Sequence, residues 1–240
     1  MNLEIQENYL QINENIRNAA KRVARNPDDV KLVVVSKYKP VEIIQAAIDC
    51  GATIFGENYP EQALAKIDHF KKDAQVEWHM IGHLQSRKVK LIPGNFNLMH
   101  SVDSMKLAVK IDDHLRKINQ KQRVLLEVNL SGEISKGGWD ASDRKNWDTI
   151  LSEFVQVIEM PGLVVEGLMT MPPLSDNPEN SRVIFKKLCL FQEFMMKHTS
   201  EIYWKDLSMG TSYDYEVAVE EGARYVRIGQ AILGIREKIR

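Results

Sequence analysis

Eight times along the sequence, a short apolar run is followed by a longer segment whose apolar residues recur at helical spacing. Runs such as Leu32–Val35, with three consecutive valines, are typical of strands buried on both faces of a parallel sheet. The predicted strands are residues 31–37, 53–55, 76–81, 97–102, 123–130, 163–169, 206–209 and 223–228. Because no polar linker separates these units, the alternation favours a closed (β/α)8 barrel over an open doubly wound sheet.

The segment before the first strand predicts one additional helix. Its apolar residues recur at helical spacing over residues 3–25, and the pattern ends before Asn26 and Pro27. A chain of 240 residues is within the usual range of a single α/β barrel. We therefore expect an α/β fold with one domain over residues 1–240, a TIM-type (β/α)8 barrel with an extra N-terminal helix.

Charge and composition argue against several classes of function. Lys plus Arg (32) nearly balance Asp plus Glu (33), so no global field attracts nucleic acid or an anionic membrane. No apolar run approaches the roughly 18 residues that a membrane-spanning helix needs, and the acidic N-terminus lacks the features of a signal peptide. Cys50 and Cys189 lack metal-ligand spacing, which fits reduced thiols. We expect a cytoplasmic protein without a metal, nucleic-acid or membrane partner.

Lys37 is the first candidate for chemistry. It ends the first predicted strand, and ligands in α/β folds bind at the carboxyl ends of strands. An amine fixed there on rigid backbone is well placed to react with a carbonyl group. Taken alone, Lys37 also fits the solvated end of a strand, so its interpretation depends on the residues at the other strand ends.

The residues that follow the last two predicted strands indicate a phosphate site. TIM-type barrels frequently hold a phosphate between these two loops and a helix N-terminus. Hydroxyls and glycines in residues 208–212 and in residues 229–230 would let oxygen atoms and backbone N–H groups approach a phosphate closely. Each segment alone also fits an ordinary turn or helix cap. Their occurrence on adjacent strands, with Lys37 on the first strand, favours the phosphate site.

A lysine that faces a phosphate site across a barrel mouth suggests a Schiff base. In a sugar-phosphate aldolase the lysine captures a substrate carbonyl, whereas in other proteins it captures the aldehyde of pyridoxal 5′-phosphate (PLP). Arg227 favours PLP, because an arginine at this strand end could face the pyridine nitrogen and would keep it unprotonated. An unprotonated ring is a poorer electron sink, so such a site would hold the cofactor and disfavour carbanion chemistry.

Other polar groups in the predicted strands have less specific interpretations. His79 is expected to pack and to form hydrogen bonds. Glu127 and Glu166 lie at strand positions predicted to point into the barrel. There they either tune a site or are buried and paired.

A set of short motifs resembles the pyridoxal phosphate homeostasis protein family. The motifs are Val34-Val35-Ser36-Lys37, Gly56-Glu57-Asn58, residues 78–85 (WHMIGHLQ), residues 136–139 (KGGW), residues 167–171 (GLMTM), residues 207–210 (LSMG) and Arg227-Ile228-Gly229. They occur in the family's order and cover the chain from about residue 31 to residue 234. The resemblance implies the barrel that this family shares with the N-terminal domain of bacterial alanine racemase, with PLP as cofactor.

The resemblance also implies roles for individual residues. Lys37 would form the internal aldimine, and Arg227 would face the pyridine nitrogen. The expected phosphate contacts, partly through backbone N–H groups, are Ser208, Gly210, Ser212, Gly229 and Gln230. Gln230 stands where the family often has threonine, so it is assigned only through its backbone N–H. The remaining expected cofactor contacts are Asn58, His83 and Met169, and no catalytic residue is expected.

The implied function is to hold PLP and to buffer it or deliver it to apo-enzymes, as a monomer. The alternative is a PLP-dependent amino acid racemase that uses the same lysine. Racemisation needs acid and base groups on both faces of the substrate carbon, and in alanine racemase one of these comes from an additional C-terminal domain. This chain ends at Arg240, about where the predicted barrel closes, so we expect a binding protein rather than an enzyme. An aldolase stays open as a third function, for which the purified protein would be colourless.

Overall fold

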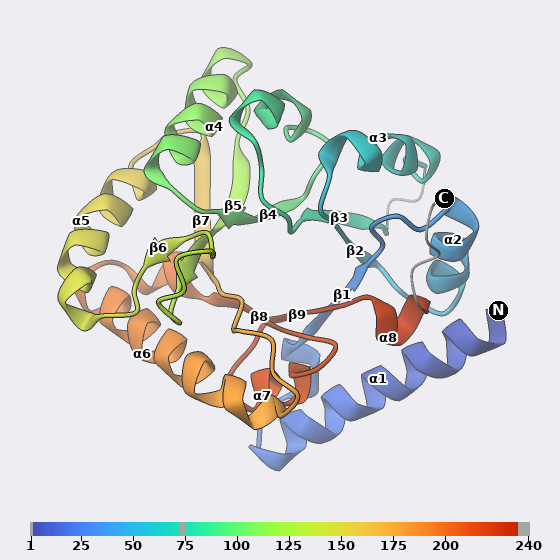
Figure 1. Cartoon of the computed structure of the whole chain (residues 1–240). Coiled ribbons are helices and arrows are strands. Elements are labelled where there is room, and N and C mark those ends of the chain that lie inside the picture. The colour runs from blue at the N-terminus through green and yellow to red at the C-terminus, as the bar shows by residue number, and fades with distance from the viewer. Residues whose placement is uncertain (1, 73–74, 235–240) are drawn as a thin grey trace.

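A computed structural model describes residues 2–72 and 75–234, and its strands close into a ring (Figure 1). The strands are β1 (Lys31–Val35), β2 (Ile54–Glu57), β3 (Glu77–Met80), β4 (Leu98–Val102), β5 (Gln122–Asn129), β6 (Trp139–Asp140), β7 (Leu163–Met169), β8 (Asp206–Thr211) and β9 (Tyr225–Ile228). Among the described residues every strand pair is parallel, and the neighbours run β4-β3-β2-β1-β9-β8-β7-β5. The pairing of β4 with β5 closes the ring. The predicted TIM-type barrel is confirmed.

Two short elements differ from the prediction. β6 lies in a segment predicted as a loop and pairs with the end of β5, where Val128 lies opposite Trp139. A strand of two residues has no periodicity that a sequence pattern could reveal. Residues 84–91, predicted as a short helix, form a 3-10 helix over Ser86–Leu91. Pro93 follows closely, and a proline does not fit the interior of a longer regular helix.

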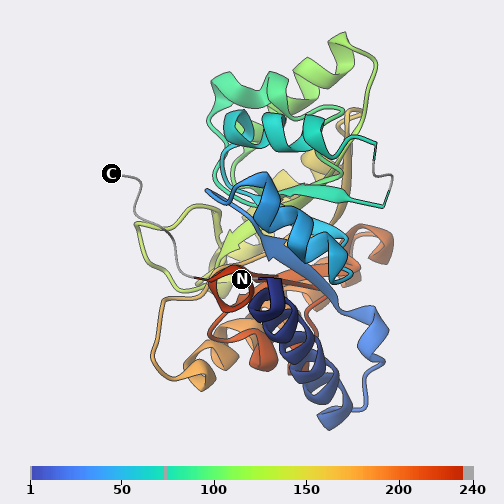
Figure 2. The ribbon, with the colours of Figure 1, turned by 90° about the vertical axis from the view of Figure 1, so that its right-hand side faces the viewer.

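Helices cover the outside of the barrel. They are α1 (Asn2–Arg22), α2 (Val41–Asp49), α3 (Pro60–His69), α4 (Met105–Lys117), α5 (Trp147–Ile158), α6 (Arg182–His198), α7 (Tyr215–Glu220) and α8 (Gln230–Leu233). The predicted N-terminal helix is confirmed as α1, which packs against α2, α7 and α8 and lies outside the ring of strands (Figures 1 and 2). Of the helices in the described ranges, none is both long enough and apolar enough to cross a membrane.

A small apolar cluster fills the inside of the ring. It consists of Val33, Leu98, Leu125, Met169 and Tyr225, all from strands. The larger apolar core includes side chains from the strands and from the surrounding helices. Because alternate side chains of a strand point to opposite faces, strands such as β1, with Val33 inside and Val34 outside, contribute to both regions. The ring therefore encloses packed side chains, as in other barrels of this type, and ligands must bind at its rim.

Strand β7 contains an irregularity beside Gly167. Val165 and Gly167 lie opposite two consecutive residues of β5, Val124 and Leu125, so the register shifts by one residue at Glu166. Gly167 also lies opposite Asp206 of β8, and a Cβ atom on Gly167 would be 1.8 Å from the Asp206 carbonyl oxygen. A strand position with so close a backbone neighbour accepts only glycine.

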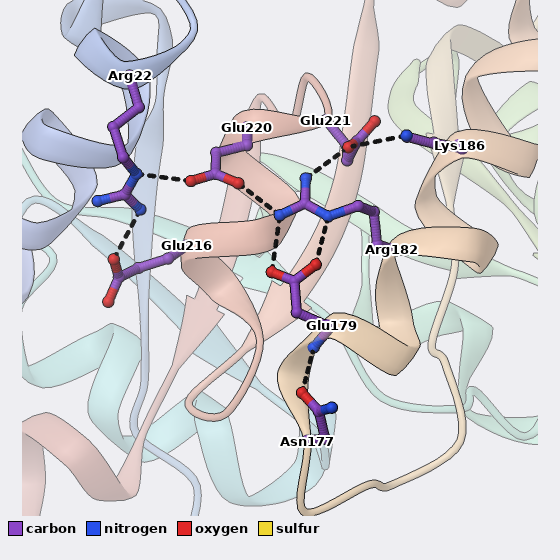
Figure 3. Close-up of polar contacts among 8 residues, drawn as sticks. All are labelled: Arg22, Asn177, Glu179, Arg182, Lys186, Glu216, Glu220 and Glu221. Atoms are coloured by element: carbon purple, nitrogen blue, oxygen red, sulfur yellow. Dashed lines mark hydrogen bonds and ion pairs between the residues drawn. The ribbon is translucent and has the colours of Figure 1, made fainter.

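A network of ion pairs on the outer surface joins α1, α6 and α7 (Figure 3). Arg182, the first residue of α6, donates to three carboxylates, each at 2.6 Å: those of Glu179, Glu220 and Glu221. Arg22 of α1 also donates to Glu220, at 2.6 Å. The first helix of the chain is thus fastened to helices that lie near the end of the chain.

Candidate functional site

Lys37 lies two residues beyond β1 and is half-buried. The backbone N–H of Ser36 still donates to Gly56 of β2 at 3.0 Å, so the extended chain continues to this point. The Ser36 side chain points outward, where Oγ donates to Glu57 Oε1 at 2.8 Å. Because successive side chains of an extended chain alternate, we expect the Lys37 side chain to be directed toward the inner side of the barrel rim. Tyr38, with φ of 62°, then turns the chain away from the rim.

A buried ion pair holds the backbone next to Lys37. Lys66 of α3 donates from Nζ to the Ser36 carbonyl oxygen at 2.8 Å and to Glu57 Oε1 at 2.7 Å. Glu57 is fully buried and Lys66 is 8 % exposed. Breaking a buried charge pair leaves an uncompensated buried charge, so this pair fixes the end of β1 that presents Lys37, although Glu57 Oε2 has no hydrogen-bond partner among the described residues.

Arg227 is a buried cation on β9, the strand next to β1. It lies opposite Val33 of the inner cluster and is 4 % exposed. Its Nη1 donates to Ser208 Oγ of β8, and its Nη2 donates to the Thr170 carbonyl oxygen at 3.1 Å. Burial lowers the pKa of Arg227 to about 10, an effect that the carboxylates of Glu127 and Asp214 oppose. Arg227 therefore keeps its charge at neutral pH.

The two predicted phosphate segments meet the same rim. Gly210, near the end of β8, has φ of 90°, and a Cβ atom there would lie 2.5 Å from Ala218 Cβ. Gly229 follows β9, and its Cβ would lie 3.2 Å from the Val35 carbonyl oxygen, so its backbone lies close to the end of β1. Ser212 is half-buried and Gln230 is exposed. Arg227 lies on β9, which pairs with β1, Gly229 follows β9, and Ser208 lies on β8, the next strand in the barrel.

The other three predicted residues lie in different surroundings. Asn58 follows β2, and its Oδ1 is buried without a hydrogen-bond partner among the described residues. His83 has a side chain that is 70 % exposed, and its Nδ1 lies 2.6 Å from Asp103 Oδ2. Met169 is part of the inner cluster and is 2 % exposed. Asn58 therefore offers a free acceptor, His83 lies toward the solvent, and Met169 lies toward the barrel interior.

Nothing in the sequence singles out two further residues near these groups. His100 lies within the apolar run 98–102, yet its Nδ1 is 2.7 Å from Ser208 Oγ. Asp103 pairs with His83. Asp103 Oδ2 and Glu127 Oε1 both lie near Gly137, each 3.7 Å from the position that a Cβ atom of this residue would take. The contacts of His100 and Asp103 are with residues on other strands, and only the folded structure shows which strands are neighbours.

Glu127 is the carboxyl group with the most perturbed titration near the rim. Burial raises its pKa to about 7 and the Asp103 carboxylate adds to this effect, while Arg227 and His83 lower it. Of the two interpretations that the sequence left open for Glu127, the buried and paired carboxylate is not found: Glu127 is half-buried, and among the described residues its charge is only partly compensated. Such a group costs folding free energy once it ionises.

We expect Glu127→Gln to stabilise the protein at pH 8 by about 2–3 kcal/mol. The pKa of Glu127 rises from an ordinary 4.5 to about 7 on folding, so the folded state binds more protons between these pH values and its stability falls as the pH rises through them. In the glutamine variant the free energy of unfolding should no longer fall with pH through this group. Urea unfolding at pH 5 and pH 8 measures it, with the exposed Glu133→Gln as control. Equal stability changes in the two variants would contradict the assignment.

The chain resembles known proteins over nearly its whole length. Residues 8–237 match the family described as alanine racemase, N-terminal domain. A pyridoxal phosphate homeostasis protein from Aquifex aeolicus is 39% identical over 231 residues, 96% of this chain and 98% of that protein. Another, from Vibrio alginolyticus, is 36% identical over 237 residues, 97% and 98% of the two chains. The structure of PipY from Synechococcus elongatus with PLP bound matches with a TM-score of 0.77 and 28% identity, covering 92% of this chain and 100% of that one.

Proposed function

Because this chain belongs to the pyridoxal phosphate homeostasis protein family, we propose that it binds PLP as a Schiff base on Lys37. The observation that carries the proposal is the buried Arg227 on β9, the strand next to β1, where it donates to Ser208 and to the Thr170 carbonyl oxygen. A buried cation with so few anionic neighbours needs a reason to be there. An acceptor nitrogen on the ring of a bound cofactor supplies that reason.

The residues at the rim fit this cofactor. Arg227 is a buried donor on β9, and Asn58 Oδ1 is a buried acceptor without a partner among the described residues. We propose that the phosphate is bound by a group of residues after β8 and β9: Ser208, Gly210, Ser212, Gly229 and Gln230. Asn58, His83 and Met169 complete the proposed set of cofactor contacts. His83 lies at its exposed outer edge, and Met169 lies on the side of the barrel interior.

The same groups support a role in holding PLP rather than in catalysis. When bound, PLP supplies an aldehyde that condenses with amines and a ring that withdraws electrons. Arg227 stays protonated at neutral pH and can only donate, so it leaves a ring nitrogen that faces it without a proton. The ring then withdraws electrons less strongly. We therefore propose a non-catalytic protein that buffers PLP or delivers it to apo-enzymes.

The balanced charge and the two free thiols, Cys50 and Cys189, support a cytoplasmic protein, and we propose that it acts there as a monomer.

Uptake and delivery of PLP are tested in two stages. Protein mixed with PLP should turn yellow, and borohydride should bleach the band; protein that stays colourless would remove the proposal and make the aldolase the function to test. Protein loaded with PLP should then activate a PLP-dependent apo-enzyme faster than the same concentration of free PLP. Equal rates would exclude delivery and leave buffering.

A further inference from the structure

A line of hydrogen-bonded side chains crosses the inside of the barrel. It starts at Glu77, the first residue of β3, whose Oε2 lies 3.4 Å from His79 Nε2. The other ring nitrogen of His79, Nδ1, lies 3.0 Å from His100 Nε2. His100 Nδ1 lies 2.7 Å from Ser208 Oγ, which accepts from Arg227. The line thus leads from the amino end of the barrel to the arginine of the proposed site.

The middle of this line is sealed from water. His79, His100 and Ser208 are fully buried, and Arg227 is 4 % exposed. The ring of Tyr225 packs against both imidazoles, with centroid distances of 5.5 Å to His79 and 5.2 Å to His100. No polar side-chain atom of this line is among the buried unpaired atoms of the described residues. The side chains of His79, His100 and Ser208 are therefore satisfied by their neighbours in the line.

The two ends determine the direction of every hydrogen bond between them. Arg227 can only donate, and an ionised Glu77 can only accept. Burial lowers the pKa of both His79 and His100, so both imidazoles are neutral, while its contact with His79 lowers the pKa of Glu77. A neutral imidazole has one donor and one acceptor, and a serine hydroxyl donates one proton.

One arrangement satisfies all these groups. Arg227 donates to Ser208 Oγ, and Ser208 donates in turn to His100 Nδ1. His100 Nε2–H then donates to His79 Nδ1, and His79 Nε2–H donates to Glu77. An additional proton on either imidazole would give that ring two donors and would leave the Ser208 hydroxyl proton without an acceptor in the line. The titratable groups that face the line are Glu77, Arg123, Glu166, Tyr225 and Arg227.

We propose that Glu77, His79 and His100 are positioning residues for the cofactor site. Their one-directional hydrogen bonds orient the Ser208 hydroxyl, and this hydroxyl holds the Arg227 guanidinium toward the pyridine nitrogen. The effect on the ring nitrogen rests on the proposed binding of PLP, whereas the hydrogen bonds of the line are present without the cofactor. His79, expected to serve only packing and hydrogen bonds, thus acts on the site through two neighbours.

The direction of the line is tested on protein without cofactor. Two-bond ¹H–¹⁵N correlation spectra of histidine side chains distinguish the tautomers and the charged form. We expect His79 and His100 to be neutral with the proton on Nε2, without change between pH 6 and 8. A charged ring, or a proton on Nδ1 in either residue, would overturn the inference. This result does not depend on whether the protein binds PLP.

The effect on the site is tested with His100→Phe, which keeps a ring but removes both links. We expect PLP to dissociate about tenfold more readily, because Arg227 would no longer be directed at the ring nitrogen and their hydrogen bond would be weakened, and we expect the visible band to shift. Tyr225→Phe is the matched control, because it keeps the ring contacts and leaves the line intact. A folded His100→Phe protein with unchanged affinity and band would overturn the positioning role. Should this variant not fold, the tautomer spectra still test the inference. Wild-type protein that takes up no PLP would contradict the proposed function but not the direction of the hydrogen bonds in the line.

Discussion

Lys37→Ala is expected to abolish the covalent attachment of PLP. The wild-type protein should show a visible band that borohydride bleaches, and mass spectrometry should then find one phosphopyridoxyl group on Lys37. The variant should gain no such group, because its truncated side chain has no amine to react. Ser36, Glu57 and Lys66 hold the backbone at this position through contacts that do not involve the Lys37 side chain, so the variant should fold normally.

Lys136→Ala is the matched control for this experiment. Lys136 is another lysine on a loop that follows a strand, and its Nζ donates to the Met171 carbonyl oxygen at 2.8 Å. Its replacement should leave the adduct on Lys37 unchanged. An adduct that persists in Lys37→Ala, or that disappears in Lys136→Ala, would contradict the assignment of the lysine.

Gly167→Ala should destabilise the fold by about 4 kcal/mol, near the upper end of single-residue effects. The added Cβ would lie 1.8 Å from the Asp206 carbonyl oxygen and 2.6 Å from its carbonyl carbon. Both are backbone atoms of the neighbouring strand, so relief requires β7 and β8 to separate. This separation would also move Ser208, which lies two residues after Asp206 on β8 and pairs with Met169 of β7. Urea unfolding measures the loss.

Gly137→Ala is the control for this second prediction. The atoms nearest to a Cβ at Gly137 are 3.7 Å away, which is an ordinary contact distance. This variant should therefore change stability by less than about 0.5 kcal/mol. Equal unfolding midpoints for the two variants would show that β7 and β8 adapt to a side chain at position 167.

The barrel was predictable because its evidence is local. Each strand and each helix has its own period in the sequence, and closure follows from the number of units. The rim position of Lys37 was also predictable, since it needs only the direction of one strand. Gly167 belongs to a motif that the sequence presents, but the reason for glycine there is the approach of Asp206, a neighbour in space.

The inner polar groups were not predictable, because their partners are also neighbours in space rather than in the sequence. His100 is hidden in a predicted strand, and its contacts join β4 to the preceding strand, through His79, and to the distant β8, through Ser208. The Ser36 side chain bonds Glu57 of the neighbouring strand, and the Ser36 carbonyl oxygen accepts from Lys66, which reaches it from a helix. His83 shows the opposite case, because its motif suggested a cofactor contact and the structure places its side chain mostly in solvent.

The pairing of β1 with β9 has a consequence for how the protein matures. Val33 and Arg227 are opposite one another in this pair, although almost the entire chain lies between them. Closing so long a loop is slow compared with local folding. Lys37 and Arg227 therefore come to the same rim only when the last strand joins the first. A ligand that contacts both would bind only the closed ring and would stabilise it by mass action, so the proposed cofactor would hold the two ends of the fold together.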